Sequence, residues 1–136
     1  MLRLGLTLLA LATPLPAVAA GCDPPAPLRF APGTSGIEIH GAVPRGMRDC
    51  LTVGARAGQV LEASITSTER NATFQVHPPG WRVDRDPHGG VDVGKRGLAA
   101  DDAMRTRITL PADGNYLIVI GTTRGSADYT LRVTIK

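Results

Sequence analysis

The chain has 136 residues, of which 15 are Lys or Arg and 12 are Asp or Glu, so its formal net charge is +3 and its sequence pI is about 9.3. This length is typical of one domain. The basic residues are scattered along the chain and are not interleaved with aromatic side chains, which argues against a nucleic-acid partner.

The first twenty residues have the pattern of a secretory signal peptide. Arg3 supplies a positive charge, residues 4–12 form an apolar run, and residues 14–20 end in small side chains. The apolar run is too short to span a bilayer, so we expect no transmembrane span. The pattern predicts a periplasmic or secreted protein.

Two cysteines allow two alternatives. Cys22 and Cys50 give an even count in an exported chain, which predicts a disulfide between the N-terminal segment and the second expected strand. Residues 19–22, Ala-Ala-Gly-Cys, also resemble the cleavage box of bacterial lipoproteins, in which Cys22 would carry a lipid anchor. Ala19 stands where that box usually has Leu, and acylation would leave Cys50 without a partner.

Residues 21–35 contain four prolines and predict an extended arm, because proline cannot donate a backbone hydrogen bond. From residue 36 to residue 136 the chain reads as one domain of short strands separated by turns. Alternating apolar residues predict strands at 37–41, 49–55, 60–67, 72–77, 107–110, 116–121 and 128–136. The turn at 56–59 predicts a hairpin, and we expect the last strand to pair with residues 116–120.

The most informative stretch is residues 107–121, where two strand-like runs flank the turn residues 111–115. Pro111, Asp113 and Gly114 favour a tight turn, so this stretch predicts a β-hairpin. The exit run is apolar at every position from 116 to 120, which predicts a central strand covered on both faces.

The fold class that follows is all-β, an antiparallel two-sheet β-sandwich of about seven to eight strands. Seven inward-facing residues are expected to share its core: Leu61, Ile65, Phe74, Ile108, Ile118, Leu131 and Val133.

Residues 78–104 are rich in glycine and predict a long loop. Its acidic run at 84–92 departs from a calcium-binding loop, because His88 and Lys95 occupy positions that need oxygen ligands. Trp81, the only tryptophan, either caps the end of the core or is an exposed aromatic contact.

The sequence shows none of the catalytic motifs considered next. The sequence has no Gly-x-Ser-x-Gly motif, and its three histidines are too widely spaced for a zinc site. Neighbouring carboxylates on a Gly-rich loop are usually solvated rather than paired for glycosidase chemistry. We expect no enzymatic activity, no cofactor and no metal.

Four pieces of the chain carry a family resemblance. They are Ala-Arg-Ala-Gly-Gln at 55–59, Pro-Pro-Gly at 78–80, Leu-Pro-Ala-Asp-Gly-Asn-Tyr at 110–116, and Tyr-Thr-Leu-Arg-Val-Thr-Ile-Lys at 129–136. In this order they resemble exported β-sandwiches of the pre-peptidase C-terminal type and, within that group, the periplasmic inhibitors of g-type lysozyme. The resemblance implies a non-enzymatic protein that blocks a lysozyme cleft with a β-turn loop.

The inhibitors that the chain resembles use a Ser-Gly-x-Tyr loop. Gly114 and Tyr116 match it, while Asp113 stands where serine is expected, so the resemblance implies partner contacts from Asp113, Gly114, Asn115 and Tyr116. A carboxylate facing a cleft whose general acid is a glutamate would add like-charge repulsion. Tyr116 either inserts its ring into the partner or packs inward, and its phase with Ile118 favours inward packing.

Two other functions stay open. A glycan- or protein-binding accessory module of the bacterial cell envelope would use Trp81 and the 78–104 loop. A structural envelope protein would use neither the loop nor the 111–116 turn.

Overall fold

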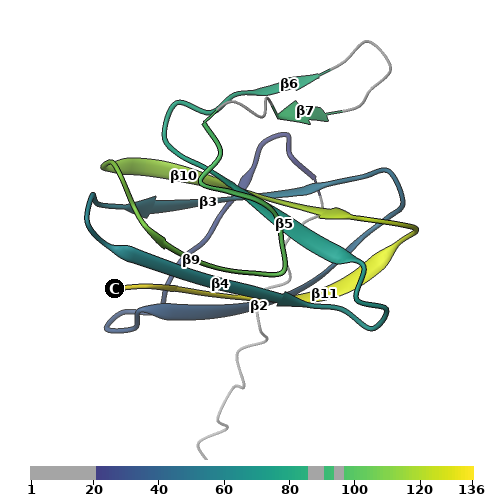
Figure 1. Cartoon of the computed structure of the whole chain (residues 1–136), viewed down its shortest axis with the longest axis horizontal. Coiled ribbons are helices and arrows are strands. Elements are labelled where there is room, and N and C mark those ends of the chain that lie inside the picture. Colours follow the sequence, from purple (N-terminus) through teal and green to yellow (C-terminus); the bar gives the residue numbers. More distant parts are fainter. Residues whose placement is uncertain (1–20, 86–90, 94–96) are drawn as a thin grey trace, which may run out of the picture.

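The computed structural model describes residues 21–85, 91–93 and 97–136 as a β-sandwich of two packed sheets (Figure 1). The predicted signal peptide, residues 1–20, lies outside the described residues, as do residues 86–90 of the acidic run. Within the described part, no helix is long and apolar enough to cross a membrane.

The first sheet has five strands in the order β1, β3, β10, β5, β8. Their bounds are Ala26–Pro27, Asp49–Ala55, Gly114–Thr122, Ala72–His77 and Ala100–Ala103. The central strand β10 pairs antiparallel with β3 on one side and with β5 on the other. Tyr116, Ile118 and Ile120 belong to the core between the sheets. Leu117 and Val119 are buried on the outer face, so the prediction of a central, two-sided strand is confirmed.

The second sheet has four antiparallel strands in the order β2, β11, β4, β9. Their bounds are Gly36–Val43, Ala127–Ile135, Val60–Thr66 and Arg105–Thr109. Six of the seven predicted core residues are buried in one cluster, and Ile108 is half-buried against it. The alternation of apolar and polar residues therefore predicted the inner faces of both sheets correctly.

Three predicted pairings are wrong, because the chain crosses between sheets where hairpins were expected. β3 and β4 lie in different sheets, and so do β9 and β10, the predicted hairpin of residues 107–121. β11 pairs with β2 and β4 instead of residues 116–120. After Thr109, buried Leu110 bonds through its backbone to Gln59 and Gly58, and Pro111 has no N–H to extend the ladder. The chain therefore leaves one sheet and enters the other.

The Pro-rich arm is not separate from the sheet. β1 pairs with β3 in parallel, and the N–H of Leu28 donates to the carbonyl of Thr52 at 2.8 Å. Prolines are tolerated there because β1 is an edge strand. One edge of the predicted antiparallel sandwich is therefore parallel.

The predicted 78–104 loop contains three short strands. β6, Val83–Arg85, and β7, Val91–Val93, pair antiparallel as a small hairpin beside the five-stranded sheet (Figure 1). β8 extends the edge of that sheet by pairing with β5. Strands of three or four residues with Gly and Asp between them carry too little periodicity to be predicted.

A buried carboxylate joins the two sheets. Asp49, at the start of β3, is only 1% exposed. One of its oxygens accepts a hydrogen bond from the Tyr129 hydroxyl of β11 at 2.8 Å, and the other accepts from the N–H of Gly21 at 3.0 Å. Burial, together with the bond to Asp49, raises the pKa of Tyr129 far above its usual range, so the phenol stays protonated as a donor. The Tyr129 ring packs directly on Gly41, where any side chain would collide with it.

We predict that Tyr129→Phe lowers the free energy of unfolding by about 1–3 kcal/mol, because the buried Asp49 carboxylate loses a donor. Urea unfolding measures the change. Thr134→Val, on the outer face of the same strand, is the control and should change stability by less than about 0.5 kcal/mol. Equal losses for the two variants would contradict a special role for the Asp49–Tyr129 bond.

The predicted disulfide between Cys22 and Cys50 is present. It lies on the outer face of the five-stranded sheet with Leu117 and Val119, and half-buried Trp81 packs over this cluster. The bond uses the sulfur atom that acylation of Cys22 would need, so disulfide and lipid anchor exclude each other.

Removing this disulfide by the double change Cys22→Ser and Cys50→Ser should cost about 3–4 kcal/mol in the loop-entropy model, since 28 residues separate the cysteines. Denaturant unfolding measures the loss. Intact mass of the untreated protein should show two hydrogens fewer than the reduced form. A diacylglyceryl adduct on Cys22 would contradict the disulfide.

Candidate functional site: three turns at one end of the sandwich

Three connections meet at the end of the sandwich drawn on the left of Figure 1. They are residues 56–59 between β3 and β4, residues 78–81 after β5, and residues 111–115 before and at the start of β10. We call these three segments together the turn end. Three of the four pieces that carry the family resemblance therefore come together in space.

Asp113 joins two of these segments. Its side chain is exposed, and its Oδ1 accepts a hydrogen bond from the N–H of Ala57 at 2.7 Å. The 56–59 turn is closed on itself, because Gln59 Oε1 accepts from the N–H of Arg56 at 2.8 Å. The Asp113 carboxylate therefore links the 111–115 turn to the 56–59 turn, which is stabilised by its own hydrogen bond.

Residues 78–81 hold the turn from the other side. Gly114 has φ of +138°, and a Cβ at this position would lie 2.8 Å from Cγ of Pro79. Trp81 donates its indole N–H to the carbonyl of Asn115 at 2.9 Å. The two sequence-predicted binding elements, Trp81 and the turn, are therefore parts of one surface. Trp81 covers the disulfide cluster rather than the end of the core.

Tyr116 supports the turn from inside. The residue is fully buried in the core, and its hydroxyl donates to the carbonyl of Ala112 at 2.7 Å. The same oxygen accepts from the N–H of Ala112 at 3.2 Å. This arrangement is of the tyrosine-corner kind found in β-sandwiches. The predicted inward packing is confirmed, and the ring is not available to a partner in this conformation.

The surface that remains consists of Asp113, Gly114 and Asn115, which are exposed side by side. No three His, Cys, Asp or Glu side chains of the described ranges gather closely enough to hold a metal ion. The geometry suits contact with another molecule.

The sequence indicates the turn but not the residues that support it. Ala57 and Pro79 carry no side-chain chemistry that would single them out, and each lies far from residues 111–115 in the sequence. Only the glycine of Pro-Pro-Gly and the glycine at 58 marked these segments as turns.

We predict that Tyr116→Phe lowers the free energy of unfolding by about 1–2 kcal/mol, because the backbone groups of Ala112 lose a buried partner. A urea melt measures this. The variant keeps the ring, so partner binding below the melting range should be unchanged. A large loss of binding without a loss of stability would show that the hydroxyl contacts the partner directly.

Comparison with solved structures finds the same fold in periplasmic lysozyme inhibitors. PliG from Aeromonas hydrophila, a periplasmic inhibitor of g-type lysozyme, is 26% identical with a TM-score of 0.62, and the match covers 82% of this chain and 95% of that one. PliG from Salmonella Typhimurium is 22% identical with a TM-score of 0.58, covering 82% and 96%. A mutant of the Escherichia coli PliG is 23% identical with a TM-score of 0.58 and the same coverage.

No family model matches the sequence, and a search of curated proteins finds no match. The similarity is thus carried by three-dimensional structure. The chain shares its β-sandwich, over nearly the whole length of each relative, with three periplasmic inhibitors of g-type lysozyme.

Proposed function

We propose that this protein is an exported, non-enzymatic inhibitor of g-type lysozyme that acts in the periplasm. The observation that carries the proposal is the likeness to PliG of Aeromonas hydrophila, at 26% identity and over 95% of that chain. The secretory pattern of residues 1–20 supports the same compartment. The disulfide at Cys22 favours a form without a lipid anchor, because disulfides persist in the oxidising periplasm.

The contact element in this proposal is the exposed part of the turn end, namely Asp113, Gly114 and Asn115. Trp81 and Tyr116 act as supports that hold the turn in one shape. A loop that is already ordered loses little conformational entropy when it binds, so more of its contact energy appears as affinity. A loop that enters an enzyme cleft needs this property.

Asp113 is the residue that limits affinity in this proposal. Glycoside hydrolases carry carboxyl groups in their clefts, and a second carboxylate brought against them is repelled and loses its hydration. The hydrogen bond from Ala57 satisfies one oxygen of Asp113 but leaves its charge in place. A serine would offer an oxygen to the same N–H without the charge.

We predict that Asp113→Ser strengthens inhibition of a g-type lysozyme by roughly 1 kcal/mol, or about fivefold in the inhibition constant. Gly114→Val should abolish inhibition, since its φ of +138° disfavours a side chain and Pro79 occupies the space. Titration of lysozyme activity on cell-wall substrate gives both constants.

Gly121→Val is the matched control, because an added Cβ at this position of β10 would meet no atom within 4 Å and its backbone is not in the left-handed region. It should inhibit like the wild type, and thermal melts exclude unfolding of each variant. If neither the wild type nor Asp113→Ser inhibits at micromolar concentration, the inhibitor proposal is wrong. A pull-down against peptidoglycan fragments and envelope proteins would then test the accessory-module alternative.

A further inference from the structure

A row of three polar side chains crosses the outer face of the four-stranded sheet. Arg132 of β11 lies opposite Ser64 of β4, and Ser64 lies opposite Arg105 of β9. Adjacent strands are about 4.8 Å apart, so the two arginines stem from strands about 10 Å apart with the small Ser64 between them. We call Arg132, Ser64 and Arg105 the arginine row.

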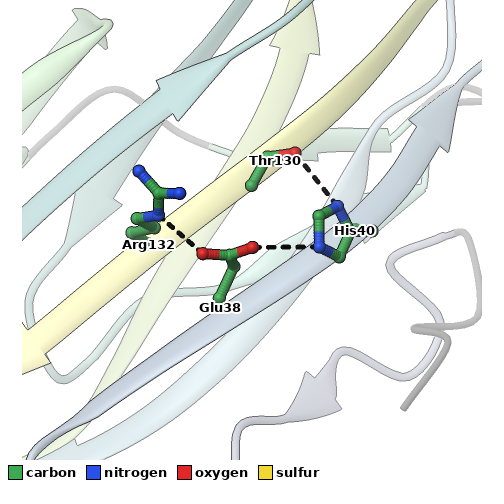
Figure 2. A network of polar contacts seen from close by, with 4 residues as sticks. All are labelled: Glu38, His40, Thr130 and Arg132. Atoms are coloured by element: carbon green, nitrogen blue, oxygen red, sulfur yellow. Dashed lines mark hydrogen bonds and ion pairs between the residues drawn. The ribbon is translucent and has the colours of Figure 1, made fainter. Parts of the chain in front are cut away.

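Arg132 is held in one orientation by a chain of contacts. Its Nε donates to Glu38 Oε2 at 2.6 Å, and the other oxygen of Glu38 lies 3.1 Å from His40 Nε2 (Figure 2). Thr130 closes the chain, with its hydroxyl 3.0 Å from His40 Nδ1. The hydrogen bond from Arg132 lowers the pKa of Glu38, so the carboxylate stays charged and keeps its hold on the guanidinium.

Arg132 contacts Glu38 through Nε, and its two terminal NH₂ groups are directed away from Glu38 in Figure 2. Arg107 repeats the arrangement, because its Nε is the atom that faces Glu62 Oε1 at 3.4 Å. Arg105, two residues before Arg107 on β9, has no carboxylate partner among the described residues. The face therefore presents guanidinium donors that the protein itself does not use.

Two open hollows meet at the arginine row, and all three of its residues line both of them. Their volumes are about 620 and 540 Å³. Glu62 and Arg107 extend the first hollow, while Thr66 and Arg70 extend the second. Each hollow is larger than a single anion and has room for a neutral polar body beside a charged group.

Charge on this face is unbalanced. The arginines that line the hollows number four, and the two glutamates beside them are already engaged by Arg132 and Arg107. Among the described residues, Arg105 and Arg70 have no carboxylate partner. A guanidinium group can donate two parallel hydrogen bonds to the oxygens of a phosphate. A serine hydroxyl between two such groups can donate a further hydrogen bond.

We infer that the arginine row binds the phosphate group of a phosphorylated sugar. The phosphate oxygens lie over Ser64 between Arg105 and Arg132, and the sugar hydroxyls occupy the neighbouring hollow against Thr66 or Glu62. The site is independent of the turn end, which lies on loops at the end of the sandwich rather than on the outer face of this sheet. The inference therefore does not rest on lysozyme inhibition.

The test is an NMR titration of the isotope-labelled protein with glucose-6-phosphate, glucose and inorganic phosphate. We expect glucose-6-phosphate to shift the backbone signals of Ser64, Arg105 and Arg132. Inorganic phosphate should shift the same signals with a dissociation constant at least about threefold higher. Glucose should shift none of them. An unchanged spectrum with glucose-6-phosphate would overturn the inference, and so would equal binding of glucose.

Arg105→Gln and Arg132→Gln should each weaken binding at least about fivefold, since each removes a charge-assisted contact. Arg45→Gln, an exposed arginine in the β2–β3 connection, makes the same change in net charge and should stay within about twofold of the wild type. An equal loss of affinity in all three variants would mean that only net charge matters, and it would contradict a specific site at the arginine row.

Glu38→Ala separates orientation from charge. It makes the protein more positive, so a purely electrostatic attraction would strengthen, whereas loss of the hold on Arg132 should weaken binding. Stronger binding in this variant would contradict the inferred geometry.

Vesicles that contain phosphatidic acid are the last ligand tested. If the protein binds these vesicles but not glucose-6-phosphate, the face binds membranes and the inference is wrong. Lysozyme inhibition by Arg105→Gln should equal that of the wild type.

Discussion

β10 is apolar on both faces, so both faces have to be covered for the protein to fold. The four-stranded sheet covers the inner face, where Tyr116 and Ile118 join the core. On the outer face, the disulfide, Trp81 and Val83 of the small β6–β7 sheet cover Leu117 and Val119. This second cover draws residues 78–83 across the sheet. The contacts that fix the turn end are therefore a consequence of burying one strand.

The contacts that support the turn differ in kind. Tyr116 binds it from the core, Asp113 ties it to the neighbouring turn, and Pro79 and Trp81 hold it from the outer layer. The supports come from strand β10, from the 56–59 turn and from residues 78–81. Loss of one leaves the others in place, so the shape of the turn depends less on any single contact than its short length suggests.

The sequence predicted elements better than it predicted their partners. β3 and β5 have the predicted bounds because their alternation is strong and glycine or proline follows them. Their pairings could not be predicted, because a strand followed by a tight turn has the same pattern whether the chain folds back into the same sheet or crosses to the facing one.

For the site, Asp113 and Gly114 were recognisable as turn residues. The bond from Trp81 to Asn115 spans 34 residues and appears only in three dimensions. The arginine row likewise depends on register, since Ser64 and Arg132 alone are unremarkable surface residues.

The position of Asp113 bears on how an aspartate can stand where the family resemblance implies a serine. Its carboxylate accepts a hydrogen bond from the N–H of Ala57 at 2.7 Å, and a serine hydroxyl is also an acceptor for the N–H groups of turns. The shape of the turn is then insensitive to the choice, and only the charge presented to a partner differs. The charge of Asp113 would therefore affect which enzyme cleft binds the turn. A cleft with cationic groups at its mouth would bind the aspartate more tightly, whereas a cleft lined by carboxylates would repel it. Specificity at the turn end would thus be set by charge on a backbone that stays the same.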